Sequence, residues 1–405
     1  TSEAFGLTDD PLYNPYWGYQ DGRIRSSRTR KSQQPLALLA WDFTLNDDFR
    51  LQTTFSYLGG ESCYSALDWH SAPNPMPHYY RYAANPEVAA AVREAWESRD
   101  PDVTQVNWDE LYYVNRHGTA TPASYAVGGA VTANRCFQFV SSFEYRMSGL
   151  NRLRGGVQIR YGRTSRYQRL EDLLGGDYLL NVDSYLIDDE YYGDKIQNDL
   201  QHPNRRVGVG ERYGYDYDLD YSSYGAWVLA DLHSTREAGL YGYVGGRAAQ
   251  VSFYRDGRYE KELFPGGRSL GRSDRLSFTE YLLKGGIGYM FTPSHSIEVR
   301  VAYGDVAPVA DAVFLAPEYQ NRTIADPRPV NLLSGEVCYR LSLRSVEIGL
   351  SGYVTTTRGE SDVRHYYDDL AGEFSNMELS AIDKLYVGAE LGVTVRLTDR
   401  WSLRG

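Results

Sequence analysis

Three aspartates at alternate positions form the most suggestive metal-binding pattern in the chain. Asp216, Asp218 and Asp220 lie in the stretch YGYDYDLDY, and carboxylate oxygens are the ligands that a hard cation such as Ca²⁺ prefers. An EF-hand loop would have Gly at its sixth position and Glu at its twelfth, where this chain has Tyr221 and Trp227. A solvated acidic loop is the alternative. A loop-bound Ca²⁺ is therefore the one cofactor that the sequence suggests.

Aromatic side chains in polar stretches are the second group that could bind a ligand. The chain has 36 Tyr, 13 Phe and 7 Trp among its 405 residues, and rings in loops can stack on sugars or on other ring-bearing ligands. Packing of each loop on itself is the alternative role. The ligand-binding candidates are Trp69, Tyr79, Tyr80, Trp96, Trp108, Tyr112 and Tyr215.

Two of these stretches are predicted to be helical. NPEVAAAVREAWESRD, residues 85–100, begins with the capping dipeptide Asn-Pro and carries Trp96. TQVNWDELYYVNR, residues 104–116, carries Trp108 and Tyr112. The two helices either face a ligand or pack together as a small core of their own loop.

Composition and motif content argue against several classes of protein. The net charge of −11 and the pI near 5.2 exclude nucleic acid as an expected partner, because phosphate binding needs a basic surface. The seven His show no ligand spacing, and neither a catalytic Ser–His–Asp signature nor a phosphate-binding loop is found, so we do not expect an enzyme. The widely spaced cysteines are expected to be small core fillers rather than disulfide partners: Cys63, Cys136 and Cys338.

Alternating hydrophobicity in tight hairpins indicates the elements that hold these residues. Apolar side chains recur at every second position of residues 36–45 and again of residues 49–57, on both sides of the turn NDD. This period of two is typical of β-strands with one apolar face. Similar pairs flank turns near residues 149, 233–239, 292–294, 344 and 398–400. The six tight turns predict twelve strands, the last of them incomplete.

Long polar connectors between the hairpins distinguish two β architectures. The connectors are residues 58–133, 165–223, 255–277, 304–335 and 358–383. A soluble β-sandwich has mostly short loops, because structureless loops longer than about 15 residues are uncommon. An up-and-down transmembrane barrel instead places short turns at one rim and long loops at the other. We therefore predict an all-β fold, a partial antiparallel up-and-down transmembrane β-barrel with twelve strands.

The alternation also predicts which side chains meet lipid. A charged side chain facing the middle of a bilayer is costly, whereas a lumen tolerates charge. The residues expected to face lipid are Leu39, Phe55, Ile159, Val299 and Val393. Those expected to face the lumen are Arg50, Arg160, Arg300 and Arg396. Glycines within the strand segments RGGVQIRYG and GGIGYMF are expected to mark close packing or bends.

The ordered set of connectors and strands resembles one known family. The segments NPYWGYQDGRIRSSR (14–28), LEDLLGGDYLLNVDSY (170–185), IQNDLQHPNRRVGVGERYGYDYDLD (196–220) and GRSDRLSFTEYLLKGGIGYMF (271–291) look like parts of TonB-dependent outer-membrane receptors of the Bacteroidetes type. The resemblance covers nearly the whole chain. It implies a barrel of about 22 strands in the outer membrane of a Gram-negative cell, with a plug domain in its lumen.

The resemblance also implies partners. These are the TonB–ExbB–ExbD motor acting through the plug, outer-membrane lipid, a small ligand such as a siderophore, an oligosaccharide or a peptide, and a surface lipoprotein. Residues 1–405 would form one partial barrel domain without the plug, the TonB box and the terminal strands. NPYWGYQDGRIRSSR would be an extracellular connector, with its aromatics near the outer rim and its arginines in solvent or in the lumen.

Two functions remain open on the sequence alone. One is an importer whose lumen and loops bind a ligand until TonB pulls on the plug. The other is a passive porin, or a glycan-binding adhesive barrel at the cell surface, without energy coupling. A plug domain and a TonB box upstream of Thr1 would favour the importer.

Overall fold

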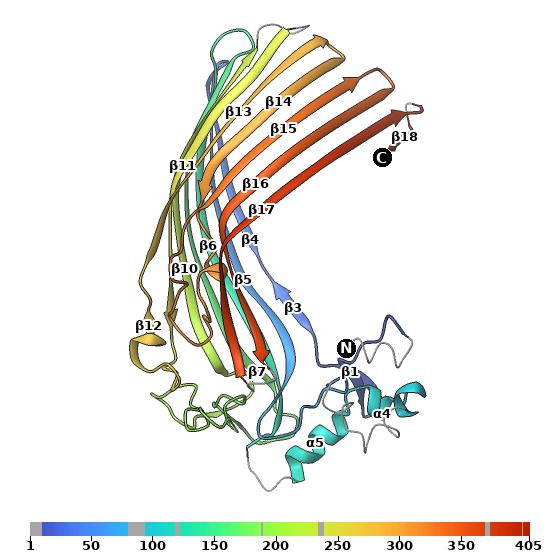
Figure 1. Ribbon diagram of the computed structural model, residues 1–405, viewed down its shortest axis with the longest axis vertical. Helices are drawn as coiled ribbons and strands as arrows, with labels where there is room; N and C mark the ends of the chain where they lie inside the picture. The colour runs from blue at the N-terminus through green and yellow to red at the C-terminus, as the bar shows by residue number, and fades with distance from the viewer. Residues whose placement is uncertain are drawn as a thin grey trace.

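One curved antiparallel sheet makes up most of the computed structural model, which describes residues 10–79, 94–117, 122–187, 189–233, 239–368, 373–398 and 400–405 (Figure 1). Successive strands along the chain are neighbours in the sheet, so the topology is up-and-down. The fourteen strands of the sheet are β3 (Arg30–Gln33), β4 (Leu36–Asn46), β5 (Phe49–Trp69), β6 (Tyr125–Arg146), β7 (Arg152–Asp172), β10 (Arg212–His233), β11 (Gly239–Gly257), β12 (Gly271–Arg272), β13 (Leu276–Thr292), β14 (His295–Val306), β15 (Val330–Ser342), β16 (Val346–Asp368), β17 (Glu373–Arg396) and β18 (Ser402–Arg404). The predicted fold class, a partial up-and-down barrel, is confirmed.

The sheet has twelve strand positions, the number that the hairpins predict. β3 and β4 occupy one position, because Gln33 pairs with Glu61 and Leu36 pairs with Leu58, which keeps one register along β5. β12 is a short branch that pairs with the end of β11. We call the curved sheet the wall.

The outer face of the wall carries an apolar band on the side of the short turns. Val299 of β14 lies between Ile287 of β13 and Val337 of β15 in the strand register, and all three side chains are exposed. Exposed aromatic rings border this band at two levels, which is typical of a transmembrane barrel. These rings are Trp41, Phe43, Phe291 and Trp401 near the short turns, and Phe137, Tyr161, Tyr224 and Tyr303 farther along the strands.

The inner face of the wall is polar at the same level. Arg300 lies 2.9 Å from Glu298 and 3.3 Å from Glu336, and Arg154 lies 2.6 Å from Asp231. Each of these arginines follows an outward-facing position in its strand, as the alternation requires. The apolar and the charged side chains of these strands therefore lie on opposite faces of the wall, as the alternation predicts, and the lipid-facing assignment stays a prediction.

Glycines in β13 make room for tyrosines on this inner face. Gly286 and Gly288 pair with Tyr243 and Tyr241 of β11. A Cβ atom at Gly286 would lie 2.5 Å from the Tyr243 ring, and one at Gly288 would lie 2.3 Å from the Tyr241 ring. Each ring thus covers the glycine opposite it and restores the packing that the glycine lacks. The close packing predicted for GGIGYMF is confirmed.

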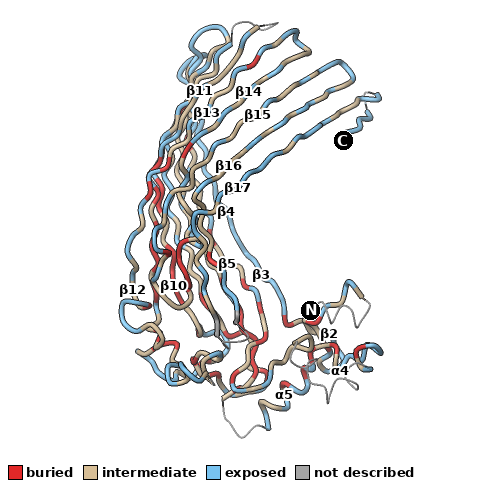
Figure 2. The backbone as a smooth tube through the Cα atoms, viewed as in Figure 1, coloured by how far each residue is buried: buried red, intermediate tan, exposed pale blue. Residues whose placement is uncertain are grey.

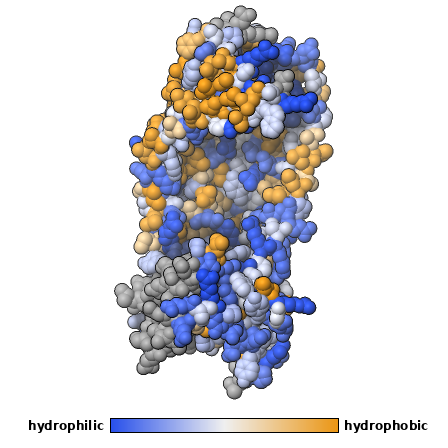
Figure 3. Space-filling view, turned by 90° about the vertical axis from the view of Figure 1, so that its right-hand side faces the viewer, coloured by the Kyte–Doolittle hydropathy of each residue, from blue (hydrophilic) through white to orange (hydrophobic). Residues whose placement is uncertain are grey.

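The two halves of the wall differ in burial and polarity. Buried residues gather in the half that carries the long connectors (Figure 2). Hydrophobic residues gather at the surface of the other half, and hydrophilic residues dominate near the connectors (Figure 3). An apolar surface that is exposed along several strands is unfavourable in water and favourable against lipid.

Short elements fold within the connectors. They are β1 (Trp17–Gln20), β2 (Arg23–Ser26), α4 (Pro101–Thr104), α5 (Trp108–His117), β8 (Leu179–Leu180), β9 (Arg206–Val207), η1 (Gly266–Arg268) and η2 (Ala310–Ala312). The helix predicted over residues 104–116 is confirmed as α5, whereas most of the helix predicted over residues 85–100 lies outside the described residues. In the described part of the chain, none of the helices has the length and apolar character needed to cross a membrane.

The strands extend farther toward the connectors than the alternation predicts. Residues 358–383, predicted as a long polar connector, instead belong mostly to the paired strands β16 and β17. That prediction was wrong because neither face of a strand has to be apolar outside the membrane. The hydropathy pattern ends there, but the backbone hydrogen bonds continue. The same reason explains why β5 continues to Trp69 and β6 begins at Tyr125.

Candidate functional site

The inner face of the wall near the long connectors brings polar and aromatic side chains together from three strands. On β7 these residues lie on the same side as Arg160, which the alternation assigns to the lumen. We call this surface the mouth and define it by Asp68 of β5, Arg166 and Gln168 of β7, and Tyr213 and Tyr217 of β10.

Asp68 is the centre of one polar group in the mouth. Its Oδ2 accepts hydrogen bonds from the Tyr213 hydroxyl at 2.9 Å and from Gln168 Nε2 at 3.3 Å. Burial, and then the Asp68 carboxylate, raise the pKa of Tyr213 well above its usual range, so this tyrosine stays a donor. His70 Nε2 lies 3.7 Å from the same oxygen, and the histidine is only 8% exposed.

A second group joins the wall to the connector between β14 and β15, residues 307–329. Arg166 makes a two-pronged ion pair with Asp311, at 2.7 and 2.9 Å. The Tyr217 hydroxyl donates to Glu318 at 3.3 Å. Phe314 of this connector is buried in an apolar cluster that contains Tyr217 and strand residues of β10, β11 and β13. The connector therefore packs onto the inner face rather than extending away from it.

Two buried cations join three connectors to one another. Lys261 Nζ donates to the Asn198 side chain and to the Gly214 carbonyl, each at 2.5 Å, and lies 5.0 Å from the centre of the Tyr319 ring. Burial lowers the pKa of Lys261 to about 8. Arg255 Nε donates to the Pro317 carbonyl at 2.6 Å, and burial lowers the pKa of Arg255 to about 10.

The three candidate metal ligands are paired with arginines. Asp218 lies 2.6 Å and Asp216 lies 3.4 Å from Arg258, and Asp220 lies 2.9 Å from Arg163. They stand on the regular strand β10 rather than in a loop. Within the described ranges, no group of three or more His, Cys, Asp or Glu side chains is placed to hold a metal ion. The bound Ca²⁺ stays an untested prediction.

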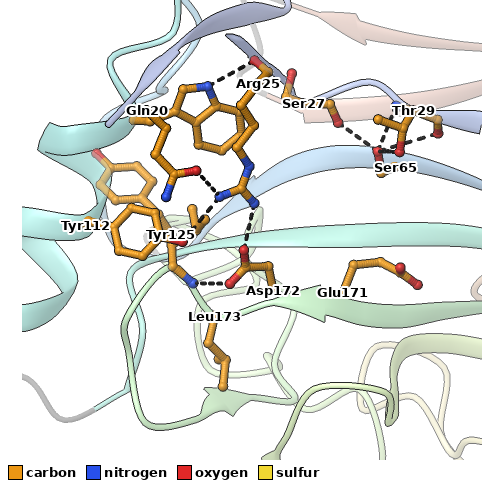
Figure 4. A network of polar contacts seen from close by, with 12 residues as sticks. Gln20, Arg25, Ser27, Thr29, Ser65, Tyr112, Tyr125, Glu171, Asp172 and Leu173 are labelled. Carbon is orange, nitrogen blue, oxygen red and sulfur yellow. Dashed lines mark hydrogen bonds and ion pairs between the residues drawn. The ribbon is translucent and has the colours of Figure 1, made fainter. Parts of the chain in front are cut away.

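Two ligand-binding candidates, Trp108 and Tyr112 of α5, take part in an internal network around Arg25. Figure 4 shows Tyr112 and Asp172 beside Arg25. The Arg25 guanidinium lies 4.2 Å from the centre of the Trp108 ring, donates to the Tyr112 hydroxyl at 3.2 Å and pairs with Asp172 at 2.6 Å. Trp108 Nε1 donates back to the Arg25 carbonyl at 3.2 Å. Trp108 is fully buried, so its ring holds the connector together.

The remaining aromatic candidates are spread over different places. Trp96 is buried and makes an edge contact with Tyr13 at 5.4 Å between ring centres. Trp69 is half-buried against the apolar cluster that contains Trp108 and Leu111 of α5. Tyr215 is half-buried against the apolar cluster of the mouth, which contains Tyr217 and Phe314. Tyr79 is half-buried, and Tyr80 lies outside the described residues. Of the six candidates that the structure describes, it places Tyr215 alone at the mouth.

The segment NPYWGYQDGRIRSSR folds differently from the prediction. It forms a hairpin of β1 and β2, in which Asp21 and Gly22 have φ angles of 48° and 71°. An Asp-Gly turn with positive φ at both positions is a strong hairpin signal, which the prediction of a plain connector missed. The expectation that its arginines lie in solvent or in the lumen is wrong for Arg25, because that side chain is enclosed between α5 and Asp172.

Comparison with known proteins supports the fold. No protein-family model matches the chain, and no curated protein matches it. Solved structures do match. The closed form of the ferric-catecholate import receptor Fiu from E. coli K12 is 12% identical with a TM-score of 0.52, over 93% of this chain and 48% of that one. The copper transporter OprC is 9% identical with a TM-score of 0.58, over 94% of this chain and 46% of that one.

The siderophore receptor PiuA from Acinetobacter baumannii is also similar, with 12% identity and a TM-score of 0.53, over 93% of this chain and 46% of that one. The three share one barrel fold with this chain. Identities this low show the fold alone. The chain spans about half the length of each of these solved chains. Within the described residues the polar groups of the mouth bond to one another, and Tyr213 and Tyr217 are buried, whereas Arg166 and Asp311 keep part of their side chains exposed.

Proposed function

We propose that this chain is part of a TonB-dependent transporter of the Gram-negative outer membrane, which binds a scarce ligand at the mouth and imports it into the periplasm. The observation that carries the proposal is the position of the mouth. It lies on the inner face, beyond the apolar band, and its ion pair between Arg166 and Asp311 remains accessible there, with side chains 29% and 60% exposed. The likeness in fold to the import receptor Fiu and to the siderophore receptor PiuA supports it.

The proposed partners follow from this role. A plug domain would couple the barrel to TonB, ExbB and ExbD, outer-membrane lipid would surround the apolar band, and a surface lipoprotein would cover the mouth. The ligand would be a siderophore, an oligosaccharide or a peptide. The protein would carry out no chemical reaction on it.

Uptake by living cells tests the energy coupling. A ferric siderophore, an oligosaccharide and a peptide, each labelled, are offered to cells with the full-length gene, to cells without it and to cells that have the gene but lack TonB. We expect accumulation of one of the three only where both the gene and TonB are present. Equal accumulation with and without TonB would show a passive porin, and surface retention without accumulation would show an adhesive barrel.

A further inference from the structure

Two arginines flank an exposed tyrosine where the wall begins. Arg30 of β3 pairs with Tyr64 of β5 in the strand register, so their side chains lie on the same face of the sheet. The Arg28 guanidinium lies 5.4 Å from the centre of the Tyr64 ring and 5.1 Å from that of Tyr16. Both arginines are exposed, and Tyr64 is 47% exposed. Among the residues that the structure describes, neither arginine has an ion-pair partner.

The backbone that carries Arg28 is held firmly on both sides. Ser27 Oγ donates to the Tyr16 carbonyl at 2.9 Å, and Ser65 Oγ donates to the Ser27 carbonyl at 2.9 Å. The Thr29 amide donates to Ser65 Oγ at 2.8 Å. Figure 4 shows Ser27, Thr29 and Ser65 side by side in this arrangement. The exposed guanidinium therefore projects from an ordered backbone, which lowers the entropy cost of binding a ligand there.

The group lies near aromatic residues of the connectors. The Tyr16 ring makes an edge contact with His78 at 5.4 Å between ring centres. Tyr185 lies in the connector between β7 and β10. Burial raises the pKa of Tyr185, Asp68 and Asp183 raise it further, and Arg28 opposes them. Arg28 and Asp68, the carboxylate at the centre of the mouth, thus act electrostatically on the same residue, Tyr185.

These observations point to a ligand of one chemical class. A guanidinium offers a planar fork of donors that matches a carboxylate, and two such groups that pair with no carboxylate among the described residues leave this role open to a ligand. The exposed Tyr64 ring beside them provides a surface on which a planar ring can stack. We propose that Arg28, Arg30 and Tyr64 form a subsite for an aromatic carboxylate. The role of the subsite in uptake rests on the transport function proposed above, whereas its binding of an aromatic carboxylate does not.

Benzoate and its uncharged isostere benzamide test the subsite. Binding of each to the full-length protein in detergent micelles is measured by saturation-transfer NMR and titration. We expect benzoate to bind about tenfold more tightly than benzamide, a difference of about 1.4 kcal/mol. Arg28→Gln should remove this preference, and Arg28→Lys should restore only part of it, because an ammonium lacks the planar fork. Tyr64→Leu should weaken both compounds.

The matched control is Arg358→Gln, which removes an exposed arginine of β16 and should leave both affinities unchanged. Heat-modifiable gel migration confirms that each variant is folded. Equal binding of benzoate and benzamide, or an unchanged preference in folded Arg28→Gln, would overturn the subsite. Loss of TonB dependence with benzoate binding intact would instead overturn the transport function and leave the subsite standing.

Discussion

Lys261 shows how much a single residue contributes to the order of the connectors. It is a buried cation whose hydrogen bonds reach Asn198 in one connector and Gly214 at the start of β10, while Tyr319 of another connector covers it. No sequence pattern predicts its burial, because a lysine in a polar stretch is normally exposed. The burial arises only when three segments far apart in the chain meet.

The lowered pKa of Lys261 predicts how opening of the connectors depends on pH. Buried Lys261 has a pKa of about 8, whereas an exposed lysine has one of about 10.4. Between these values, opening takes up a proton, so it becomes harder as pH rises, by at most about 1.4 kcal/mol per pH unit. Below pH 8 this dependence vanishes. Hydrogen exchange of residues 196–200 and 259–264, corrected for the intrinsic rate, measures it. Lys261→Met should remove the slope, and an identical slope in both proteins would contradict the assignment.

At the scale of the element, the strands within the apolar band were predictable because lipid on one side forces strict alternation. Leu39, Phe55 and Ile159 lie on one outward row of the register, as predicted. The outer parts of the strands were not predictable by this signal, because both of their faces meet water or connectors. The β1–β2 hairpin carried a different signal, its Asp-Gly turn, that alternation does not detect.

A pair of substitutions in β14 tests the assignment of its faces. Val299→Arg places a charge toward lipid near the middle of the band and should cost about 2–4 kcal/mol. Arg300→Val removes partly exposed ion pairs with Glu298 and Glu336 and should cost at most about 1 kcal/mol. Unfolding of the full-length protein by denaturant in lipid vesicles gives both values. The reverse ranking would mean that the strand is shifted by one residue, which exchanges its two faces.

At the scale of the whole molecule, the candidate site was less predictable than the fold. The wall follows from local pattern, since each hairpin predicts its own pairing. The mouth depends on contacts such as Arg166 with Asp311 and Tyr213 with Asp68, which join residues more than a hundred positions apart. Trp108 was a plausible ligand-binding residue by type, but the fold uses it as core. Only the convergence of connectors decides which aromatic side chains stay exposed.

The two edges of the wall give the last prediction. Among the described residues, β4 pairs with β5 alone and β18 with β17 alone, so one side of each edge strand has free backbone donors and acceptors. In lipid, each unsatisfied group costs several kcal/mol. These 405 residues expressed alone should therefore fail to give the heat-modifiable gel band of a closed barrel, whereas the longer protein proposed above should give it. A heat-modifiable band from the isolated chain would show that twelve strand positions close on themselves, and the wall would then be a complete small barrel whose curvature in lipid exceeds that seen here.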